Sequence, residues 1–270
     1  MNVNDFIQFV RTEKIPLGEE TEKALKELTN PHYTVAVVGP FQVGKSTLLN
    51  RVFLGEEILL KEGDGRCTTA VMTKVVYRPE KRLTVFYRDP AMEPRVYSGE
   101  AVTPDLIANL TVADDKDEIE RQKKRTELAQ EIKGLQLEYP CENIKQISFY
   151  DTPGIDAPNQ ELIDLTTIQF LQDADLVVLV VDAARELDES IKRFLSHSVF
   201  RNGLGRVLIL AAYRPEREMK TPEELDALKE TIQAQLSQMG RGYMPVYNYA
   251  YDQKAEGVDL VGTVAVRDAI

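Results

Sequence analysis

A chain of 270 residues, 43% of them hydrophobic, is long enough to bury the core of one large α/β domain, or of one domain with appendages. Its formal net charge of −11 at pH 7 argues against a general surface for nucleic acid or anionic membrane, so we expect no nucleic-acid partner, although a local basic patch is compatible with this charge. The sequence shows neither a secretory signal nor an apolar run of membrane-spanning length, which favours a cytoplasmic location.

Two short amphipathic helices are expected before the first strand, at residues 4–14 and 19–29. Apolar residues recur at helical spacing in both, and Asn30-Pro31 ends the second helix. We therefore divide the chain into an N-terminal helical segment, residues 1–31, and a main domain, residues 32–250.

The strongest motif lies at residues 39–46, where GPFQVGKS fits the phosphate-binding pattern G-x-x-x-x-G-K-[ST]. An apolar, β-branched run precedes it and an apolar-periodic helix follows, which is the context that the pattern requires. Gly44 would let the backbone approach the phosphates, Lys45 would reach the β- and γ-phosphates, and the Ser46 hydroxyl would ligate Mg²⁺. The nucleotide-binding residues expected in this loop are Gly39, Pro40, Phe41, Gln42, Val43, Gly44, Lys45, Ser46 and Thr47.

Two β-rich runs follow, at residues 72–77 and 83–88, and the short polar link between them predicts a hairpin. A loop with neighbouring threonines separates the first run from the preceding helix. In GTPase-type switches, a threonine at this place supplies the second Mg²⁺ ligand, although a threonine here could equally be a strand-edge residue. We select Thr69 over Thr68 as the catalytic and metal-ligating candidate.

Residues 89–103 are loop-like in sequence, and Thr103-Pro104 begins a helix that reaches about Leu110. Residues 113–134 are densely charged and mostly helical, with a thin apolar stripe. We interpret residues 104–134 as a charged helical insertion, whose charges are most simply a solvated face; a partner surface is the alternative.

The second chemical motif is the turn that follows the apolar strand near residue 150. An acid at the end of a strand, in a sheet that also carries a phosphate-binding loop, can orient Mg²⁺ through its water shell, and a following glycine N–H can meet the γ-phosphate. Alone, D-x-P-G is a common turn, but together with the upstream loop it indicates a nucleotide site. We add Asp151, Thr152, Pro153 and Gly154 to the nucleotide-binding residues, with Asp151 also a metal candidate and Gly154 a catalytic one.

The remainder of the chain alternates between helices and apolar strands. We expect helices at 160–172, 187–200 and 222–238 and strands at 175–182, 206–212 and 244–250. This alternation predicts an α/β fold of the P-loop type, a doubly wound and mostly parallel sheet with helices on both faces and the ligand at the C-terminal edge of the strands. Residues 251–270 have a weak pattern and are taken as a tail or as the start of a helical region that lies beyond them.

With these motifs in view, the chain resembles the GTPase domain of dynamin-like proteins, especially bacterial ones. The resemblance covers roughly residues 1–250 and rests on the leading helices, on GKSTLLN, on the CTTAVMT run and on LEYP before ISFYDTPG. It implies a Mg²⁺-dependent GTPase that forms a nucleotide-dependent homodimer and whose turnover drives membrane remodelling. The family's helical stalk and membrane-binding tip have no room in this chain, so we expect either a fragment or a protein without the remodelling part. The expected protein is cytoplasmic, and any peripheral association with a membrane would depend on regions outside this chain.

Two positions depart from the family pattern. Gln42 stands two residues before Gly44, where dynamins usually have serine and atlastins carry an arginine finger; it could orient a water molecule or face the solvent, and we retain it as a catalytic candidate. The base-reading motif [NT]-K-x-D is absent after the fifth strand. There, Arg214 could donate to guanine, and Glu216, or Glu218 beyond it, could accept from N1–H and N2–H; we take Arg214 and Glu216 as nucleotide-binding candidates.

We therefore expect an enzyme that hydrolyses a nucleoside triphosphate, with GTP as substrate and Mg²⁺ as cofactor. The alternative, favoured by the missing base-reading motif, is a nucleotide-sensing or scaffold domain with weak or lost turnover, or with specificity relaxed toward ATP. Phosphate release from GTP and from ATP, with and without Mg²⁺, separates the two.

Overall fold

The structure is a computed structural model. It describes residues 12, 32–40, 43–59, 68–113, 118–155, 171, 174–183, 185, 187–200, 206–213 and 221–250. The expected helices at 4–14, 19–29 and 160–172 and the tail at 251–270 fall almost wholly outside these residues, so they remain predictions.

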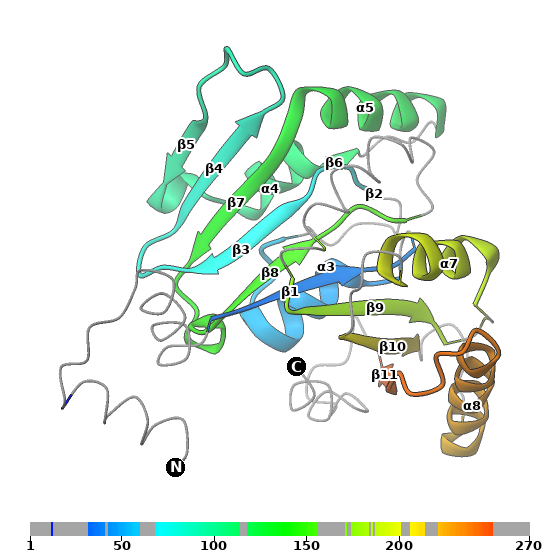
Figure 1. The fold of residues 1–270 in the computed structure, drawn as a ribbon. Helices are drawn as coiled ribbons and strands as arrows, with labels where there is room; N and C mark the ends of the chain where they lie inside the picture. Colours follow the sequence, from blue (N-terminus) through cyan, green and yellow to red (C-terminus); the bar gives the residue numbers. More distant parts are fainter. Residues whose placement is uncertain are drawn as a thin grey trace.

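Within the described residues, strands and helices follow one another along the chain (Figure 1). The strands are β1 (Tyr33–Val38), β2 (Thr68–Thr69), β3 (Thr73–Tyr77), β4 (Arg82–Tyr87), β5 (Arg95–Ser98), β6 (Val112–Ala113), β7 (Ile132–Tyr139), β8 (Ile147–Asp151), β9 (Leu176–Asp182), β10 (Val207–Tyr213) and β11 (Val246–Ala250). The α-helices are α3 (Lys45–Leu48), α4 (Pro104–Thr111), α5 (Glu118–Glu131), α7 (Glu189–Phe194) and α8 (Pro222–Gln238). Two π-helical turns, η1 (Leu49–Leu54) and η4 (Leu195–Phe200), extend α3 and α7, and η2 (Gly99–Ala101) and η3 (Glu142–Ile144) are short 3₁₀ turns.

The main sheet has the strand order β11-β10-β9-β1-β8-β3-β7-β4-β5 in the described part of the chain. The strands from β11 to β8 run parallel, whereas β3 pairs antiparallel with β8, and β4 pairs antiparallel with both β7 and β5. A second, two-stranded sheet joins β2 to β6. The strand β1 therefore lies near the middle of the sheet, between β8 and β9, where the phosphate-binding loop leaves it.

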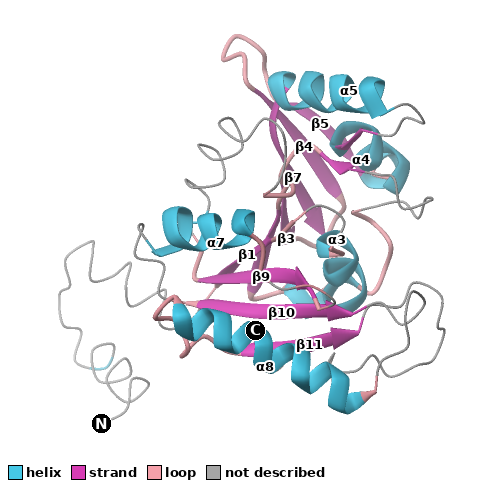
Figure 2. Cartoon of the chain, turned by 90° about the vertical axis from the view of Figure 1, so that its right-hand side faces the viewer, coloured by secondary structure: helices cyan, strands magenta, loops and turns pink. Residues whose placement is uncertain are grey.

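Alternating residues of β1 belong to two different hydrophobic cores, one on each face of the sheet. Val35 and Val37 pack in a cluster that includes residues of α3, η1 and α4, and Ala36 and Val38 pack in a cluster that includes residues of α7, η4 and α8. Figure 2 shows α3 and α7 on opposite sides of the sheet. The prediction of an α/β sheet covered by helices on both faces is thus confirmed, and the continuous burial of Val35–Val38 is what a doubly covered strand requires.

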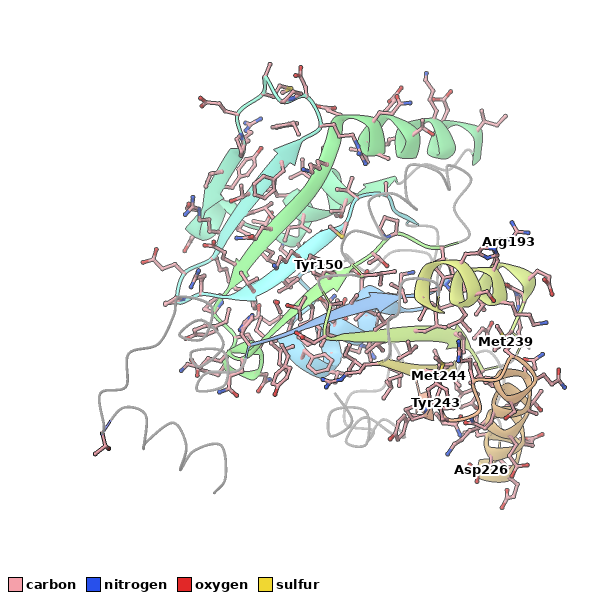
Figure 3. The ribbon with its side chains drawn as sticks, in the orientation of Figure 1. Tyr150, Arg193, Asp226, Met239, Tyr243 and Met244 are labelled. Carbon is pink, nitrogen blue, oxygen red and sulfur yellow. The ribbon has the colours of Figure 1, made fainter. Side chains whose placement is uncertain are left out.

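The connection from α8 to β11 is anchored in the core beneath the helix. Met244 is buried in the second core, while its neighbour Tyr243 is 66% exposed (Figure 3). At the other end of α8, Thr221 and Glu224 form a capping box: the Thr221 N–H donates to Glu224 Oε2 at 2.7 Å, and the Glu224 N–H donates to Thr221 Oγ1 at 3.3 Å. The helix accordingly spans the residues predicted from sequence.

The predicted hairpin between residues 72–77 and 83–88 is wrong, because β7 lies between β3 and β4. Leu137 of β7 is in register with Val75 on one side and with Leu83 on the other, and its side chain is fully buried. The charged helix ends at Glu131, and the chain turns directly into β7, so the helix expected to reach residue 134 is shorter than predicted. β3 and β4 each pair with β7 and not with each other, because this arrangement gives the apolar face of β7 a neighbouring strand on both sides.

The segment 89–103, expected as a loop, contains the edge strand β5. Val96 of β5 is in register with Thr84 of β4, so the hairpin of this region is β4–β5. Its strand is short and largely exposed, and Pro94 precedes it, which are features that protect a sheet edge from further pairing. No long apolar run marks this segment, because an exposed edge strand does not need one.

Candidate nucleotide-binding site

The phosphate-binding loop begins where β1 passes close to β9. Gly39 has φ +152°, and a Cβ atom built on it would lie 2.1 Å from the carbonyl oxygen of Val180. Gly44 has φ +93° and stands immediately before α3, which begins at Lys45. Both glycines therefore occupy backbone positions that a side chain would disturb, at the two ends of the loop.

The Lys45 side chain folds back over its own loop. Its Nζ donates to the carbonyl oxygens of Pro40 at 2.8 Å and of Gly39 at 3.1 Å, and the residue is 7% exposed. These hydrogen bonds compensate the burial of the ammonium group and hold it over the loop. Phosphate oxygens could replace the two carbonyl oxygens as its acceptors.

Ser46 and Asp151 are 105 residues apart in the sequence and meet at one point. The Ser46 hydroxyl donates to Asp151 Oδ2 at 2.6 Å. The contact arises because β8 runs parallel to β1, with Asp151 in register with Val37, so that the C-terminal ends of both strands lie at the same edge of the sheet. Tyr150, the preceding residue, packs in the core on the other face, where Lys74 Nζ lies 5.0 Å from its ring centroid (Figure 3).

The carboxyl group of Asp151 is in an environment that suits a metal ion. Burial raises the pKa of Asp151 from 3.8 to about 6, against the opposing effects of the Ser46 hydrogen bond and the Lys45 charge. Its Oδ1 atom is buried without a hydrogen-bond partner in the described part of the chain. An uncompensated carboxylate oxygen beside a serine hydroxyl is a pair of hard oxygen donors, the kind that Mg²⁺ prefers.

The donor set near Asp151 is small. Among the described residues, no group of three or more histidine, cysteine, aspartate or glutamate side chains is gathered. An ion held by Ser46 and Asp151 would therefore complete its shell with water and phosphate oxygens, as Mg²⁺ does in nucleotide sites. The residues present fit this kind of site.

The turn after Asp151 is tied to the phosphate-binding loop. Thr152 Oγ1 donates to the carbonyl oxygen of Val37 at 2.8 Å, and the Ile155 N–H donates to that of Gly39 at 3.1 Å. The whole segment from Asp151 to Ile155 is buried. A displacement of this turn would consequently be felt at the first residue of the loop.

Thr69 is placed by its backbone in β2. It pairs with Val112 of β6, and the next residue, Ala70, donates its N–H to the Thr111 carbonyl at 2.6 Å. A strand position was the alternative interpretation of this threonine, and its role as a metal ligand remains a prediction. The structure adds that the predicted switch segment is attached to the charged insertion.

The other predicted residues divide into two groups. Those brought together in the described structure are Gly39, Pro40, Val43, Gly44, Lys45, Ser46, Thr47, Asp151, Thr152, Pro153 and Gly154. Phe41, Gln42, Arg214 and Glu216 lie outside the described residues, so their roles remain predictions. Sequence reasoning missed Asn50, a buried amide in η1, whose contacts are described below.

Comparison with known proteins gives a consistent result. The model of the dynamin family matches residues 35–213. Over 245 residues the chain is 23% identical to Dynamin-like protein 1 of Campylobacter jejuni subsp. jejuni, covering 82% of this chain and 33% of that protein. Over 216 residues it is 24% identical to a bacterial dynamin-like protein of Nostoc punctiforme, covering 78% of this chain and 29% of that protein. The chain thus spans about a third of the length of these curated relatives.

Solved structures show the same fold. A chain from an oligomerised bacterial dynamin pair, described as providing a mechanism for the long-range sensing and tethering of membranes, is similar with a TM-score of 0.62 at 17% identity, over 92% of this chain and 45% of that chain. A second structure with the same description gives a TM-score of 0.63 at 15% identity, over 98% of this chain and 49% of that chain.

Proposed function

Because the chain belongs to the dynamin family and carries that family's GTPase domain, we propose that it binds GTP with Mg²⁺ between the phosphate-binding loop and Asp151 and hydrolyses it. The observation that carries the proposal is the contact between Ser46 and Asp151, directly beside the folded-back side chain of Lys45. These are the groups that phosphoryl transfer requires at one place: a phosphate counter-charge, a hydroxyl and a carboxylate.

The roles follow from the chemistry of each group. The Lys45 ammonium would exchange the carbonyls of Gly39 and Pro40 for phosphate oxygens, whose negative charge makes them stronger acceptors. Ser46 and Asp151 would hold Mg²⁺, which when bound neutralises charge on the phosphate oxygens. The backbone between Gly39 and Gly44 would surround the phosphates.

Three residues are proposed to act on the chemical step. Gly154, at the end of the buried turn, would donate its N–H toward the γ-phosphate. Thr69 would complete the metal site once the γ-phosphate is engaged, and Gln42 would orient the attacking water. Thr69→Ala and Gln42→Ala should therefore lower kcat well beyond any change in nucleotide affinity, whereas equal losses in both quantities would contradict these roles.

We propose that residues 32–250 form the GTPase domain, which includes the charged insertion at about 104–134. The leading segment at 1–31 and the tail at 251–270 lie outside this domain. A second copy would pair with this domain across the nucleotide. The similar solved structures are described as an oligomerised bacterial dynamin pair that provides a mechanism for the sensing and tethering of membranes, and we propose a peripheral membrane role of this kind for the whole protein. In the described residues no helix is both long enough and apolar enough to span a membrane.

The missing base-reading motif favours a second candidate function, a nucleotide-sensing or scaffold domain. The strand β10 ends at Tyr213, and no [NT]-K-x-D sequence follows it. With Arg214 and Glu216 as the base-contacting residues, we expect GTP to be preferred over ATP by less than about a hundredfold, or about 2.7 kcal/mol. A sensing or scaffold domain would instead bind nucleotide with little or no phosphate release.

The experiment measures phosphate release from GTP and ATP, with and without Mg²⁺, and competition of both against a fluorescent GTP analogue. Mg²⁺-dependent release from GTP supports the proposal, and binding without release supports the sensing function. Glu216→Ala should reduce the preference for GTP, whereas Glu218→Ala tests the alternative acceptor two residues away and should leave the preference unchanged if Glu216 reads the base. A preference above about a thousandfold that survives Glu216→Ala would show that other residues read the base.

A further inference from the structure

The helix that carries Lys45 and Ser46 continues into an unusual turn. The α-helix α3 passes into the π-helical turn η1, which ends with the Gly55 N–H donating to the Asn50 carbonyl oxygen at 2.7 Å, and Gly55 has φ +71°. π-helical turns are rare and occur frequently at functional sites, because they reorient one side chain relative to a regular helix. Here the reoriented turn contains Asn50.

The Asn50 side chain binds the chain that returns after this turn. Its Oδ1 accepts from the N–H groups of Ile58 at 3.3 Å and of Leu59 at 3.1 Å. All three residues are buried, with exposed fractions of 1%, 2% and 3%. In such surroundings an unpaired N–H is costly, so these two bonds fix where the chain runs as it leaves the helix.

In the sequence, this anchor lies between the two parts of the proposed catalytic site. Asn50 stands four residues after Ser46, about one turn along the same helical segment, and Ser46 binds Asp151. The chain held at Ile58 and Leu59 then leads to β2, which contains Thr69. At the far end of β2, the Ala70 N–H is held by the Thr111 carbonyl.

We propose that Asn50 is a positioning residue, which fixes the start of the segment carrying Thr69 against the helix that carries Lys45 and Ser46. The inference rests on the proposed GTP hydrolysis and adds a residue to it. Asn50 touches no reacting group; it acts through Ile58 and Leu59, and its effect should fall on the step for which Thr69 is recruited. Affinity for GTP, which depends on the phosphate-binding loop, should depend on it much less.

A general stabilising role of the same amide is the competing explanation, and the chain offers a matched control for it. Asn143 Nδ2 donates to the carbonyl oxygen of Phe53 at 3.2 Å, so it binds the same helical turn through one side-chain amide. It reaches that turn from η3, which lies far in sequence from the segment of Thr69. Loss of the Asn143 contact should affect the stability of the turn without moving Ile58 or Leu59.

The experiment compares the wild type with Asn50→Leu, Asn50→Asp and Asn143→Ala in single-turnover GTP hydrolysis, in GTP affinity with Mg²⁺ and in thermal unfolding. Leucine fills the same volume without an acceptor, and aspartate keeps the acceptor oxygen. We expect Asn50→Leu to lower kcat by about tenfold to a hundredfold, with GTP affinity within about threefold of the wild type. Asn50→Asp should recover most of kcat, and Asn143→Ala should keep it.

An unchanged kcat for Asn50→Leu, an equal loss in Asn143→Ala, or a parallel loss of kcat and affinity would overturn the proposal. If Asn50→Leu does not fold, Asn50→Ser, whose shorter hydroxyl cannot reach both N–H groups, should show the same selective loss of kcat. Absence of GTP binding by the wild type would instead overturn the proposed function, and the two failures are distinguished by this measurement.

Discussion

Lys45 is a buried cation beside the phosphate-binding loop, and this makes its removal informative. Lys45→Ala should abolish or greatly weaken GTP binding while leaving the fold intact, because its Nζ donates to the carbonyls of Gly39 and Pro40 in that loop. A charge-assisted contact contributes about 1.5–3 kcal/mol, which corresponds to a loss of affinity of at least about tenfold. Isothermal calorimetry and thermal unfolding measure the two effects.

The control for this variant is Lys145→Ala. Lys145 is an exposed lysine that pairs with Glu142 at 3.0 Å, far in sequence from the loop. Its removal should change neither GTP affinity nor the unfolding temperature appreciably. Wild-type affinity in Lys45→Ala would show that the nucleotide site is misassigned.

From the raised pKa of Asp151 we predict that metal and nucleotide binding depend on pH. Its pKa is raised to about 6, so the nucleotide-free protein carries it protonated below that pH and ionised above it. Because Mg²⁺ requires the carboxylate, affinity for GTP with Mg²⁺ should fall by up to about tenfold per pH unit below pH 6 and be flat above it. The same raised pKa also affects the free energy of unfolding. The contribution of Asp151 to folding stability is complete below about pH 3.8 and is lost as the pH rises through about 6.

The measurement is calorimetry in two buffers of different ionisation enthalpy. At pH 5.5, binding should release most of one proton, and at pH 7.5 almost none, as expected for a group that titrates near pH 6. Asp151→Asn should remove the proton release together with the Mg²⁺ dependence. Equal proton release at both pH values would mean that Asp151 does not titrate in this range.

A substitution at Gly39 tests how closely the phosphate-binding loop approaches strand β9. Gly39→Ala would place a Cβ 2.1 Å from the Val180 carbonyl oxygen at φ +152°, so it should cost about 2 kcal/mol or more in unfolding free energy. Gly240→Ala is the matched control: φ is +71°, and apart from its chain neighbours no atom of the described residues lies within 4 Å of the added Cβ. It should cost only the backbone term of about 1–2 kcal/mol. Urea unfolding that shows no greater cost at Gly39 would contradict the close approach.

At the scale of elements, the sequence was most informative where one local pattern decides the structure. The apolar run of β9, the capping box that begins α8 at Thr221, and the glycine-rich turn before Lys45 each follow from residues close together in the chain. The meeting of Ser46 and Asp151 could also be expected, because strands that both end in phosphate-site residues share one edge of a parallel sheet.

Strand order was less accessible to sequence reasoning. The link between β3 and β4 looks like a hairpin, and the strand that separates them, β7, begins directly after a charged helix, two residues before the glycine that would be taken as the end of that helix. Likewise, the contact of Asn50 with Ile58 depends on a π-helical turn, and that of Gly39 with Val180 on the neighbourhood of β1 and β9. These features are set by packing between segments far apart in the chain, which a local pattern does not encode.

Because the small sheet β2–β6 joins the segment of Thr69 to the charged insertion, we predict that nucleotide binding changes the structure of the insertion. Thr69 is in register with Val112, which stands between α4 and α5, and Figure 1 shows α5 beyond this small sheet. If Thr69 is recruited when GTP and Mg²⁺ bind, the exchange of backbone amides in β6 and at the adjoining end of α5 should change with the nucleotide. Hydrogen exchange with a non-hydrolysable GTP analogue measures this.

Residues 95–98 of β5 serve as the internal control in the same experiment. They lie at the edge of the main sheet, separated from β8 by β3, β7 and β4, and their exchange should not respond to nucleotide. A response confined to the phosphate-binding loop and Asp151 would mean that the insertion is not coupled to the site.

At the scale of the whole molecule, the site lies where two differently built halves of the sheet meet. On one side of β8 the strands are parallel and covered by helices, and on the other side β3 runs antiparallel to it and leads to the edge strand β5. The loop after β1 and the turn after β8 therefore open at one edge of the sheet. This is where a second copy of the domain would have to approach to cover the nucleotide.

Hydrolysis should for this reason depend on protein concentration. If a second domain completes the site, specific activity should rise over about two decades of protein concentration, because the active species is the dimer. GDP with aluminium fluoride, which mimics the transferring phosphoryl group, should shift the protein from monomer to dimer in light scattering. Lys45→Ala should show no such shift, since it cannot hold the phosphates. Constant specific activity, with no dimer induced by the mimic, would mean that one copy suffices for hydrolysis.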